Sequence, residues 1–278
     1  MSLNPPDVTF VVSRSGDASI FERNFALSPC LKGLPSDRLI IQEGFSSAST
    51  AYNDAIEKAN TDLIVFAHQD VYFPTGWLVD LNRSLEMLEN SDPDWGVLGC
   101  SGIKYPDIHA GYLYSVGLGI LGGPFERPTA IDTLDEFILI LRKSSGLRFD
   151  PTLPLFHFYG TDICMSARKQ KRGCYAVSAF TVHNTSYGPL APEFYKCYWH
   201  VKKRWKEFLP IQTTCIKITR WNGDYIFRRF KHACFSVIGR NMKLLPRLED
   251  PRSVLLSAAN PAHEHNARDG ATALIGSK

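Results

Sequence analysis

Two short apolar runs constrain the fold of this chain more than any other feature of its sequence. Residues 8–12 (VTFVV) and 62–67 (DLIVFA) are rich in β-branched residues and too short for typical helices. Each run is followed at once by polar residues, Ser13-Arg14 after the first and His68-Gln69-Asp70 after the second. Because a helical pattern at residues 49–59 lies between them, we expect parallel strands whose polar tips meet at one edge of a sheet.

Further segments continue the alternation of strands and helices. The predicted elements are a short strand at residues 38–42, a helix from Gly76 to residue 91, a strand at 96–100, a helix at 160–173 and a strand at 176–182. Residues 131–141 are predicted as a helix or a strand, and the glycine-rich residues 101–128 as irregular strands and loops. This alternation predicts an α/β fold with a mostly parallel sheet flanked by helices.

Composition and motif content exclude several classes of protein. With 44% apolar and 21% charged residues, the chain can bury a core and is unlike disordered sequences. Its 31 basic and 28 acidic residues balance too evenly to indicate a nucleic-acid partner. The first loop does not form a GxGxxG motif, which argues against a dehydrogenase. Seven scattered cysteines without a CxxC pair predict a reduced, cytoplasmic protein. We expect neither a secretory signal nor a membrane-spanning segment.

Charge is distributed unevenly along the chain. From Glu193 to Arg247 there are thirteen basic and three acidic residues, interleaved with aromatic residues. This segment predicts contact with an anionic membrane surface, such as the inner membrane face, or with a lipid-phosphate acceptor; the alternative is ordinary helices that cover the core. We expect a core domain at residues 1–188, a basic, aromatic and helical extension at 189–248, and a flexible tail at 249–278.

The polar tip His68-Gln69-Asp70 is the most informative candidate site. A carboxylate at the end of a parallel strand is well placed to hold a divalent cation together with a nucleotide diphosphate. Its hard oxygen ligands suit Mg²⁺ or Mn²⁺. The alternative is that Asp70 only caps the following turn.

The segments VTFVVSRSG and QEGFSSASTAYNDAIEKANTDLIVFAHQDV resemble the nucleotide-binding half of GT-A glycosyltransferases related to family 2. In that family, a helix with an Ala-x-Asn pattern leads into a hydrophobic strand that ends in an Asp-x-Asp motif. Ala51-Tyr52-Asn53 and His68-Gln69-Asp70 occupy these places. The motif His-Gln-Asp-Val is similar to the motif of a divergent bacterial branch of family-2-like enzymes, in which the first aspartate is replaced. The resemblance covers residues 8–185 and implies a GT-A (Rossmann-like) fold.

The resemblance also implies roles for individual residues. Asp70 would contact the metal, and Asp162, at the start of a helix, would be the general base for the acceptor hydroxyl; alternatively, Asp162 only stabilises the first helical turn. His183 would be a further metal ligand, or else a hydrogen-bonded structural histidine. Asp135 and Glu136 are secondary acidic candidates near the acceptor. The places where family members contact the nucleotide are occupied by Ser13, Arg14, Glu43, Asn53, His68 and Gln69.

The resemblance therefore implies an inverting glycosyltransferase of the hexosyltransferase type, dependent on Mn²⁺ or Mg²⁺, with a role in polysaccharide biosynthesis. Its donor would be a nucleotide-sugar, with UDP favoured. The base stays open, because Gln42 and Glu43 stand where the family has an aspartate. Its acceptor would be a carbohydrate or a lipid-linked molecule. The alternative function is a non-catalytic nucleotide-sugar or glycan-binding protein with a degenerate site. A nucleotidyltransferase is disfavoured, because the first loop is not a glycine-rich basic loop.

Overall fold

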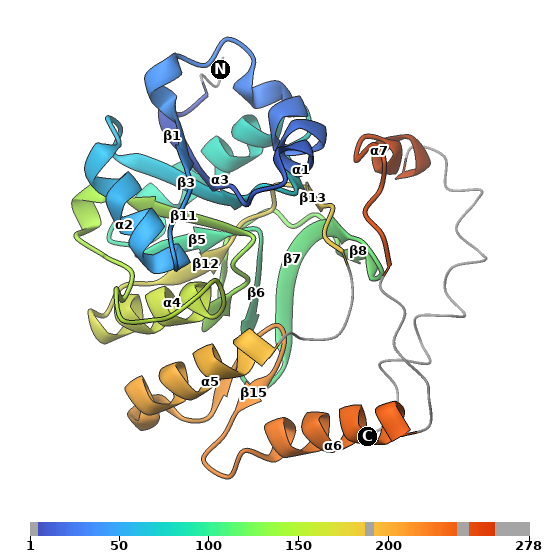
Figure 1. Cartoon of the computed structure of the whole chain (residues 1–278). Coiled ribbons are helices and arrows are strands. Elements are labelled where there is room, and N and C mark those ends of the chain that lie inside the picture. The colour runs from blue at the N-terminus through green and yellow to red at the C-terminus, as the bar shows by residue number, and fades with distance from the viewer. Residues whose placement is uncertain (1–4, 187–191, 238–244, 259–278) are drawn as a thin grey trace.

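A seven-stranded sheet with helices on both faces forms the centre of the structure, and a six-stranded sheet lies beside it (Figure 1). The structure is a computed structural model, and it describes residues 5–186, 192–237 and 245–258. The expected α/β fold with a helix-flanked sheet is confirmed. Among the helices described, none has both the length and the apolar character of a membrane span.

The seven-stranded sheet contains the two apolar runs as neighbouring strands. Its strands, in spatial order, are β2 (Leu39–Gln42), β1 (Val8–Ser13), β3 (Leu63–His68), β11 (Ile138–Arg142), β5 (Val97–Gly99), β12 (Cys174–Ala176) and β9 (Thr129–Ala130). β1 pairs in parallel with both β2 and β3, as predicted. β11 lies antiparallel between β3 and β5, so the sheet is mixed rather than mostly parallel.

Both faces of this sheet are buried, which explains the continuous apolar runs. Along β3, Ile64 and Phe66 belong to one core cluster, whereas Val65 and Ala67 belong to the other. The first cluster is covered by α2 (Ala48–Lys58), α4 (Tyr159–Lys169) and α5 (Pro192–Arg204), and the second by α1 (Ala18–Arg23) and α3 (Trp77–Ser91). Residues 131–141 were expected to form either a helix or a strand. The end of this run forms the strand β11, which is buried on both faces like β3.

The smaller sheet brings a distant part of the chain to the end of β3. Its strands are β10 (Thr133–Leu134), β6 (Ser101–Lys104), β7 (Ile108–Ser115), β13 (Thr181–His183) and β4 (Val71–Tyr72), and β8 (Gly119–Gly122) pairs with β7. The single strand predicted at residues 176–182 is wrong: the chain leaves the first sheet after β12 and enters the second at β13. This switch places His183 opposite Val71 of β4.

Helices form much of the basic C-terminal part of the chain, as expected. The buried face of α5 packs into the first core cluster, so α5 covers the core as an ordinary helix does. The later elements are β14 (Ile211–Gln212), β15 (Lys217–Ile218), α6 (Gly223–Val237) and α7 (Ser253–Ala258). In the predicted flexible tail, Val254 packs against the core, while residues 259–278 lie outside the described residues.

Candidate functional site

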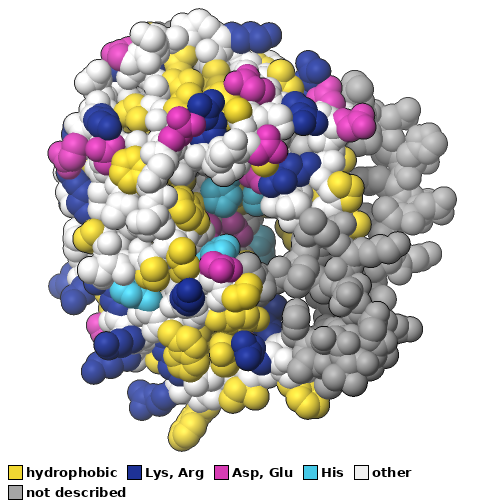
Figure 2. All heavy atoms as spheres, viewed as in Figure 1, with side chains coloured by type: hydrophobic (Ala, Val, Ile, Leu, Met, Phe, Trp, Pro, Cys, Tyr) yellow, Lys and Arg dark blue, Asp and Glu magenta, His cyan; other side chains and the backbone are white. Residues whose placement is uncertain are grey.

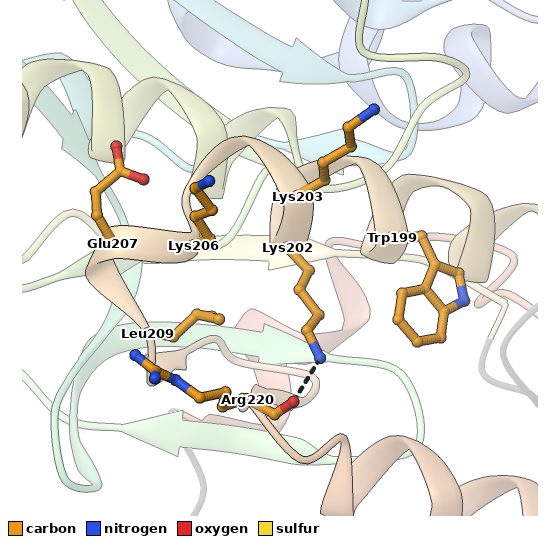
Figure 3. Close-up of a pocket in the computed structure, with 7 residues that line it drawn as sticks. All are labelled: Trp199, Lys202, Lys203, Lys206, Glu207, Leu209 and Arg220. Atoms are coloured by element: carbon orange, nitrogen blue, oxygen red, sulfur yellow. Dashed lines mark hydrogen bonds between the residues drawn. The ribbon is translucent and has the colours of Figure 1, made fainter.

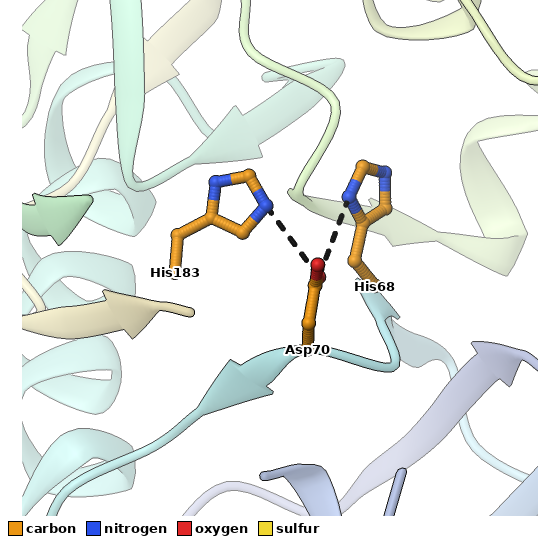
Figure 4. Close-up of side chains that lie close together, drawn as sticks. All are labelled: His68, Asp70 and His183. Carbon is orange, nitrogen blue, oxygen red and sulfur yellow. Dashed lines mark ion pairs between the residues drawn. The ribbon is translucent and has the colours of Figure 1, made fainter. Parts of the chain in front are cut away.

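The candidate site lies where β3 ends and β4 begins, and β13 completes it. β3 ends at His68, Asp70 precedes β4, and β13 ends at His183. Oδ1 of Asp70 is 3.5 Å from Nε2 of His183 and 4.0 Å from Nδ1 of His68 (Figure 4). The three ligand atoms lie within 4.8 Å of one another. We call these residues the His-Asp-His cluster; Figure 2 shows histidine and acidic side chains gathered in a hollow at the centre of the face drawn.

Burial and mutual interaction set the protonation states in the cluster. Burial lowers the pKa of His68 to about 4, so this imidazole is neutral near pH 7. Burial alone would raise the pKa of Asp70, but the two imidazoles and Arg247 outweigh it and hold that pKa well below its usual range. Burial would lower the pKa of His183, but the Asp70 carboxylate raises it. Asp70 is therefore ionised near pH 7 and able to act as a ligand.

Hydrogen bonds behind His68 fix the orientation of its ring. The Tyr159 hydroxyl donates to the carbonyl oxygen of Glu136 at 2.9 Å, so it accepts from Nε2 of His68 at 2.6 Å. This arrangement assigns the proton of the neutral imidazole to Nε2 and leaves the lone pair of Nδ1 facing the cluster. Metal-binding histidines usually have such a partner on the other ring nitrogen.

The chemistry of the cluster fits a divalent transition-metal ion. Nε2 of His183 is buried and has no hydrogen-bond partner in the described part of the chain. Its 3.5 Å contact with Oδ1 of Asp70 is an ion pair and not a hydrogen bond, so a bound ion could take its place. Imidazole nitrogens suit divalent transition-metal ions, and a carboxylate suits Mn²⁺ as well as Mg²⁺, whereas Mg²⁺ is usually bound by oxygen ligands alone. Of the two ions expected from the sequence, the ligand set therefore favours Mn²⁺.

Polar residues that follow β1 and β2 lie beside the end of β3. Arg14 and Glu43 form an ion pair, with Nε and Oε1 2.5 Å apart. Gln69 exchanges two hydrogen bonds with Ser15: its Nε2 donates to Oγ at 2.6 Å, and its Oε1 accepts from N–H at 3.1 Å. The sheet thus gathers at one edge most of the predicted nucleotide-binding residues, which are Ser13, Arg14, Glu43, His68 and Gln69.

Two carboxylates before β11 reach the same edge. The N–H of His68 donates to the carbonyl oxygen of Phe137 at 3.0 Å, which brings Asp135 and Glu136 next to the end of β3. Oε1 of Glu136 accepts from the N–H of Phe158, before α4, at 3.0 Å. Burial raises the pKa of Glu136 to about 8, and the neighbouring Asp135 adds to this effect. A carboxyl group tuned to titrate near neutral pH is a candidate general base.

Two predicted site residues lie elsewhere. Asp162 is completely buried: Nε1 of Trp205 donates to its Oδ1 at 2.6 Å, and Nε of Arg204 lies 3.1 Å from the same oxygen. Asp162 thus links α4 to α5 and is not brought to the His-Asp-His cluster. The side chain of Asn53 exchanges two hydrogen bonds with the backbone of Phe149, through which it joins α2 to a loop.

Two residues of the site were missed in the sequence. Nη2 of Arg247 lies 3.3 Å from Oδ2 of Asp70, across 177 positions of sequence. The positive charge of the segment ending at Arg247 was the sole sequence signal for it. Tyr159 stands in the segment before Asp162, but no local pattern predicts its bond to His68. The next residue, Gly160, lets α4 pack closely against the backbone of Leu134, because a Cβ at this position would lie 3.0 Å from the carbonyl oxygen of Leu134.

Comparison with known proteins gives the following similarities. No protein-family model matches the sequence. A curated protein from Fuscovulum blasticum, described as ATP synthase subunits region ORF 6, is 25% identical over 152 residues, which is 53% of this chain and 61% of that protein. The chain thus spans less than two thirds of that relative.

Similarity to solved structures occurs at low sequence identity. A mannosyltransferase from Pyrobaculum calidifontis in complex with GDP-Man and Mn²⁺ gives a TM-score of 0.44 at 12% identity, covering 97% of this chain and 84% of that chain. TarS 1–349 from S. aureus in complex with UDP-GlcNAc gives a TM-score of 0.45 at 13% identity, covering 71% of this chain and 66% of that chain. The solved structures to which this chain is similar therefore include proteins that bind nucleotide-sugars.

Proposed function

We propose that the protein is an inverting glycosyltransferase that moves a sugar from a nucleotide-sugar to a carbohydrate or lipid-linked acceptor. The observation that carries this proposal is the His-Asp-His cluster at the edge of the sheet where polar residues follow β1, β2 and β3. In open α/β sheets, ligands bind at the carboxyl ends of the strands. The family-2 resemblance of the same segments supports this chemistry.

In this proposal the cluster holds the cation, and the strand tips hold the nucleotide. His68, Asp70 and His183 supply the ligands, and a bound Mn²⁺ would supply positive charge that stabilises the departing diphosphate. Arg14 and Gln69, after β1 and β3, contact the nucleotide. UDP is the first nucleotide to test.

A base is needed because a sugar hydroxyl is a weak nucleophile near pH 7. We assign this role to Glu136, which directly precedes the residue that hydrogen-bonds to His68 at the end of β3, and whose carboxyl group has a pKa of about 8. It takes the proton of the acceptor hydroxyl while the acceptor oxygen attacks the anomeric carbon from the face opposite the diphosphate, which inverts the configuration. Asp162 remains the alternative base suggested by the resemblance.

Calorimetric titration against UDP-, GDP-, CDP- and dTDP-sugars tests the donor. We expect one nucleotide class to bind when Mn²⁺ is present and to bind much more weakly with EDTA, since the diphosphate then lacks its counter-charge. Release of the nucleoside diphosphate in the same samples separates the enzyme from a non-catalytic binding protein. That alternative has an observation in its favour, the burial of Asp162, and it predicts binding without turnover. Failure of every nucleotide-sugar to bind would contradict both functions.

The protein also presents a surface suited to a membrane. Large apolar side chains near the start of α6 are exposed to an unusual degree: Trp221 is 85% exposed, and Ile226, Phe227 and Phe230 are 59–68% exposed. Arg220, the residue before Trp221, is one of seven residues that line a groove of about 650 Å³; the others are Trp199, Lys202, Lys203, Lys206, Glu207 and Leu209 (Figure 3). Aromatic residues flanked by cations fit an anionic bilayer, with the rings at the headgroup level. We propose peripheral contact with such a bilayer.

Co-sedimentation with liposomes tests this contact. The protein should bind vesicles of phosphatidylcholine with 30% phosphatidylglycerol at low salt and lose most of that binding in about 0.5 M salt, because salt screens surface charge. Changing Phe227 and Phe230 together to Glu should abolish binding. The matched control is Ile108→Glu with Leu118→Glu, since these side chains are also exposed, 55% and 41%, but lie elsewhere. The control pair should leave binding unchanged; binding that is unaffected by salt, or by the substitutions of Phe227 and Phe230, would contradict the proposal.

A further inference from the structure

Residues 245–255, which we call the C-terminal strap, pass beside the His-Asp-His cluster and are anchored there at two points. The N–H of Leu248 donates to Oδ1 of Asn184 at 2.7 Å, and Nδ2 of Asn184 donates back to the carbonyl oxygen of Leu248 at 2.9 Å. Further along, Val254 is 5% exposed and packs with Tyr72 and Val182. The strap is therefore held by a polar contact at Leu248 and an apolar contact at Val254.

The polar anchor fixes the strap relative to the candidate metal ligands. Asn184 directly follows His183, and its N–H donates to the carbonyl oxygen of Asp70 at 2.8 Å. Asn184 is itself completely buried, and its Nδ2 also donates to Oδ1 of Asn24 at 2.7 Å. The residue that precedes Leu248 in the strap, Arg247, is thereby brought to the cluster.

Arg247 uses only part of its hydrogen-bonding capacity there. Its Nη2 lies 3.3 Å from Oδ2 of Asp70, whereas its Nε is buried without a hydrogen-bond partner in the described part of the chain. Its charge also contributes to the lowered pKa of Asp17, in the loop after β1, although the hydrogen bonds from Ser19 contribute more. A guanidinium has five N–H donors in a planar fork that matches phosphate oxygens. Arg247 therefore has donors left for an anionic ligand.

A cation in the cluster changes what Arg247 faces. Asp70 supplies the negative charge of the cluster, and Arg247 already binds one of its oxygens. A divalent cation that takes Asp70 would put like charges side by side, which is unfavourable in a partly buried site. An anion that contacts both the cation and the guanidinium removes this conflict. Without an anion, Arg247 and the cation therefore compete for Asp70. With a diphosphate bound, both contact the diphosphate.

We propose that Arg247 is a phosphate-binding residue of this site, which neutralises Asp70 in the empty protein and binds the diphosphate of the donor once a cation has taken Asp70. This inference rests on the proposed glycosyltransferase function and deepens it. It makes the C-terminal strap part of the donor site, although the strap lies far outside the segments that resemble family 2.

The test measures two affinities whose changes have opposite signs. In Arg247→Ala, Mn²⁺ alone should bind more tightly than in the wild type, by about threefold or more, because a competing cation is gone. In the same variant, with Mn²⁺ saturating, UDP and inorganic pyrophosphate should bind roughly 10–100-fold more weakly, because charge-assisted hydrogen bonds to phosphate are lost. Arg247→Lys should restore the charge without the fork and recover only part of the pyrophosphate affinity.

The matched control is Arg252→Ala, which removes an exposed arginine of the same strap that pairs with Asp250. It should leave both affinities unchanged. A purely structural role for Arg247 would weaken Mn²⁺ and pyrophosphate binding together, and that result, or unchanged pyrophosphate affinity, overturns the inference. If the protein binds pyrophosphate but binds no nucleoside diphosphate, the proposed donor is overturned, whereas the phosphate role of Arg247 is supported. A wild-type protein that binds no pyrophosphate with Mn²⁺ overturns both.

Discussion

Asp70→Asn is expected to abolish specific Mn²⁺ binding and, with it, donor turnover. Asparagine keeps the shape of the side chain but removes the negative charge that two imidazoles and Arg247 surround. The loss of Mn²⁺ affinity should exceed the roughly 10–100-fold that removal of an outer partner of a metal ligand costs, because Asp70 is itself a ligand. Titration calorimetry, or Mn²⁺ paramagnetic resonance on the protein without nucleotide, measures this affinity directly.

A control substitution and a folding check make this result decisive. Asp37→Asn makes the same chemical change at an exposed carboxylate that pairs with Arg38, and it should leave Mn²⁺ affinity unchanged. Far-ultraviolet circular dichroism should show that Asp70→Asn is folded, since the backbone bond from the N–H of Asn184 to residue 70 does not need the carboxylate. If folded Asp70→Asn binds Mn²⁺ with wild-type affinity, the cluster is not the metal site.

Much of the site could be predicted because it depends on local patterns. The apolar runs at residues 8–12 and 62–67 specify buried strands, and the polar residues that follow them must lie at the edge where parallel strands end. Asp70 and the residues after β1 and β2 lie at this edge for this reason. His183 was also found at the end of a strand, although the strand proved shorter and belongs to the second sheet.

The remainder of the site depends on contacts between distant segments, which no local pattern encodes. The antiparallel insertion of β11, which brings Glu136 to the site, follows from a strand order that the run at residues 131–141 does not reveal. The burial of Asp162 depends on Trp205, in a part of the chain that was predicted as a separate extension. Arg247 reaches Asp70 only because the chain returns after α6.

Glu136→Gln is expected to lower turnover by about 10²–10⁴-fold while leaving Mn²⁺ and donor affinity nearly unchanged, because the amide cannot accept the proton of the acceptor hydroxyl. Since the pKa of Glu136 is about 8, the wild-type rate should rise with pH up to that value and then level off. The variant should lose this rise. Asp162→Asn separates the two candidate bases: if folded, it should keep the wild-type pH profile, whereas a large loss there with normal Glu136→Gln turnover would reassign the base.

Stability gives a second readout for Glu136 that does not need substrate. Its carboxyl binds a proton more tightly in the folded protein, with a pKa of about 8, than in the unfolded chain, with a pKa near 4.5. The stability that this proton contributes is fully present below about pH 4.5 and is lost as the pH rises to about 8. Glutamine is neutral throughout and keeps an oxygen for the N–H of Phe158. The Tm of Glu136→Gln should therefore rise relative to the wild type between pH 5 and pH 8, by roughly 2–4 °C for each kcal/mol regained. A Tm difference that does not change with pH would show that the carboxyl titrates normally, and the reason for choosing it as the base would be gone.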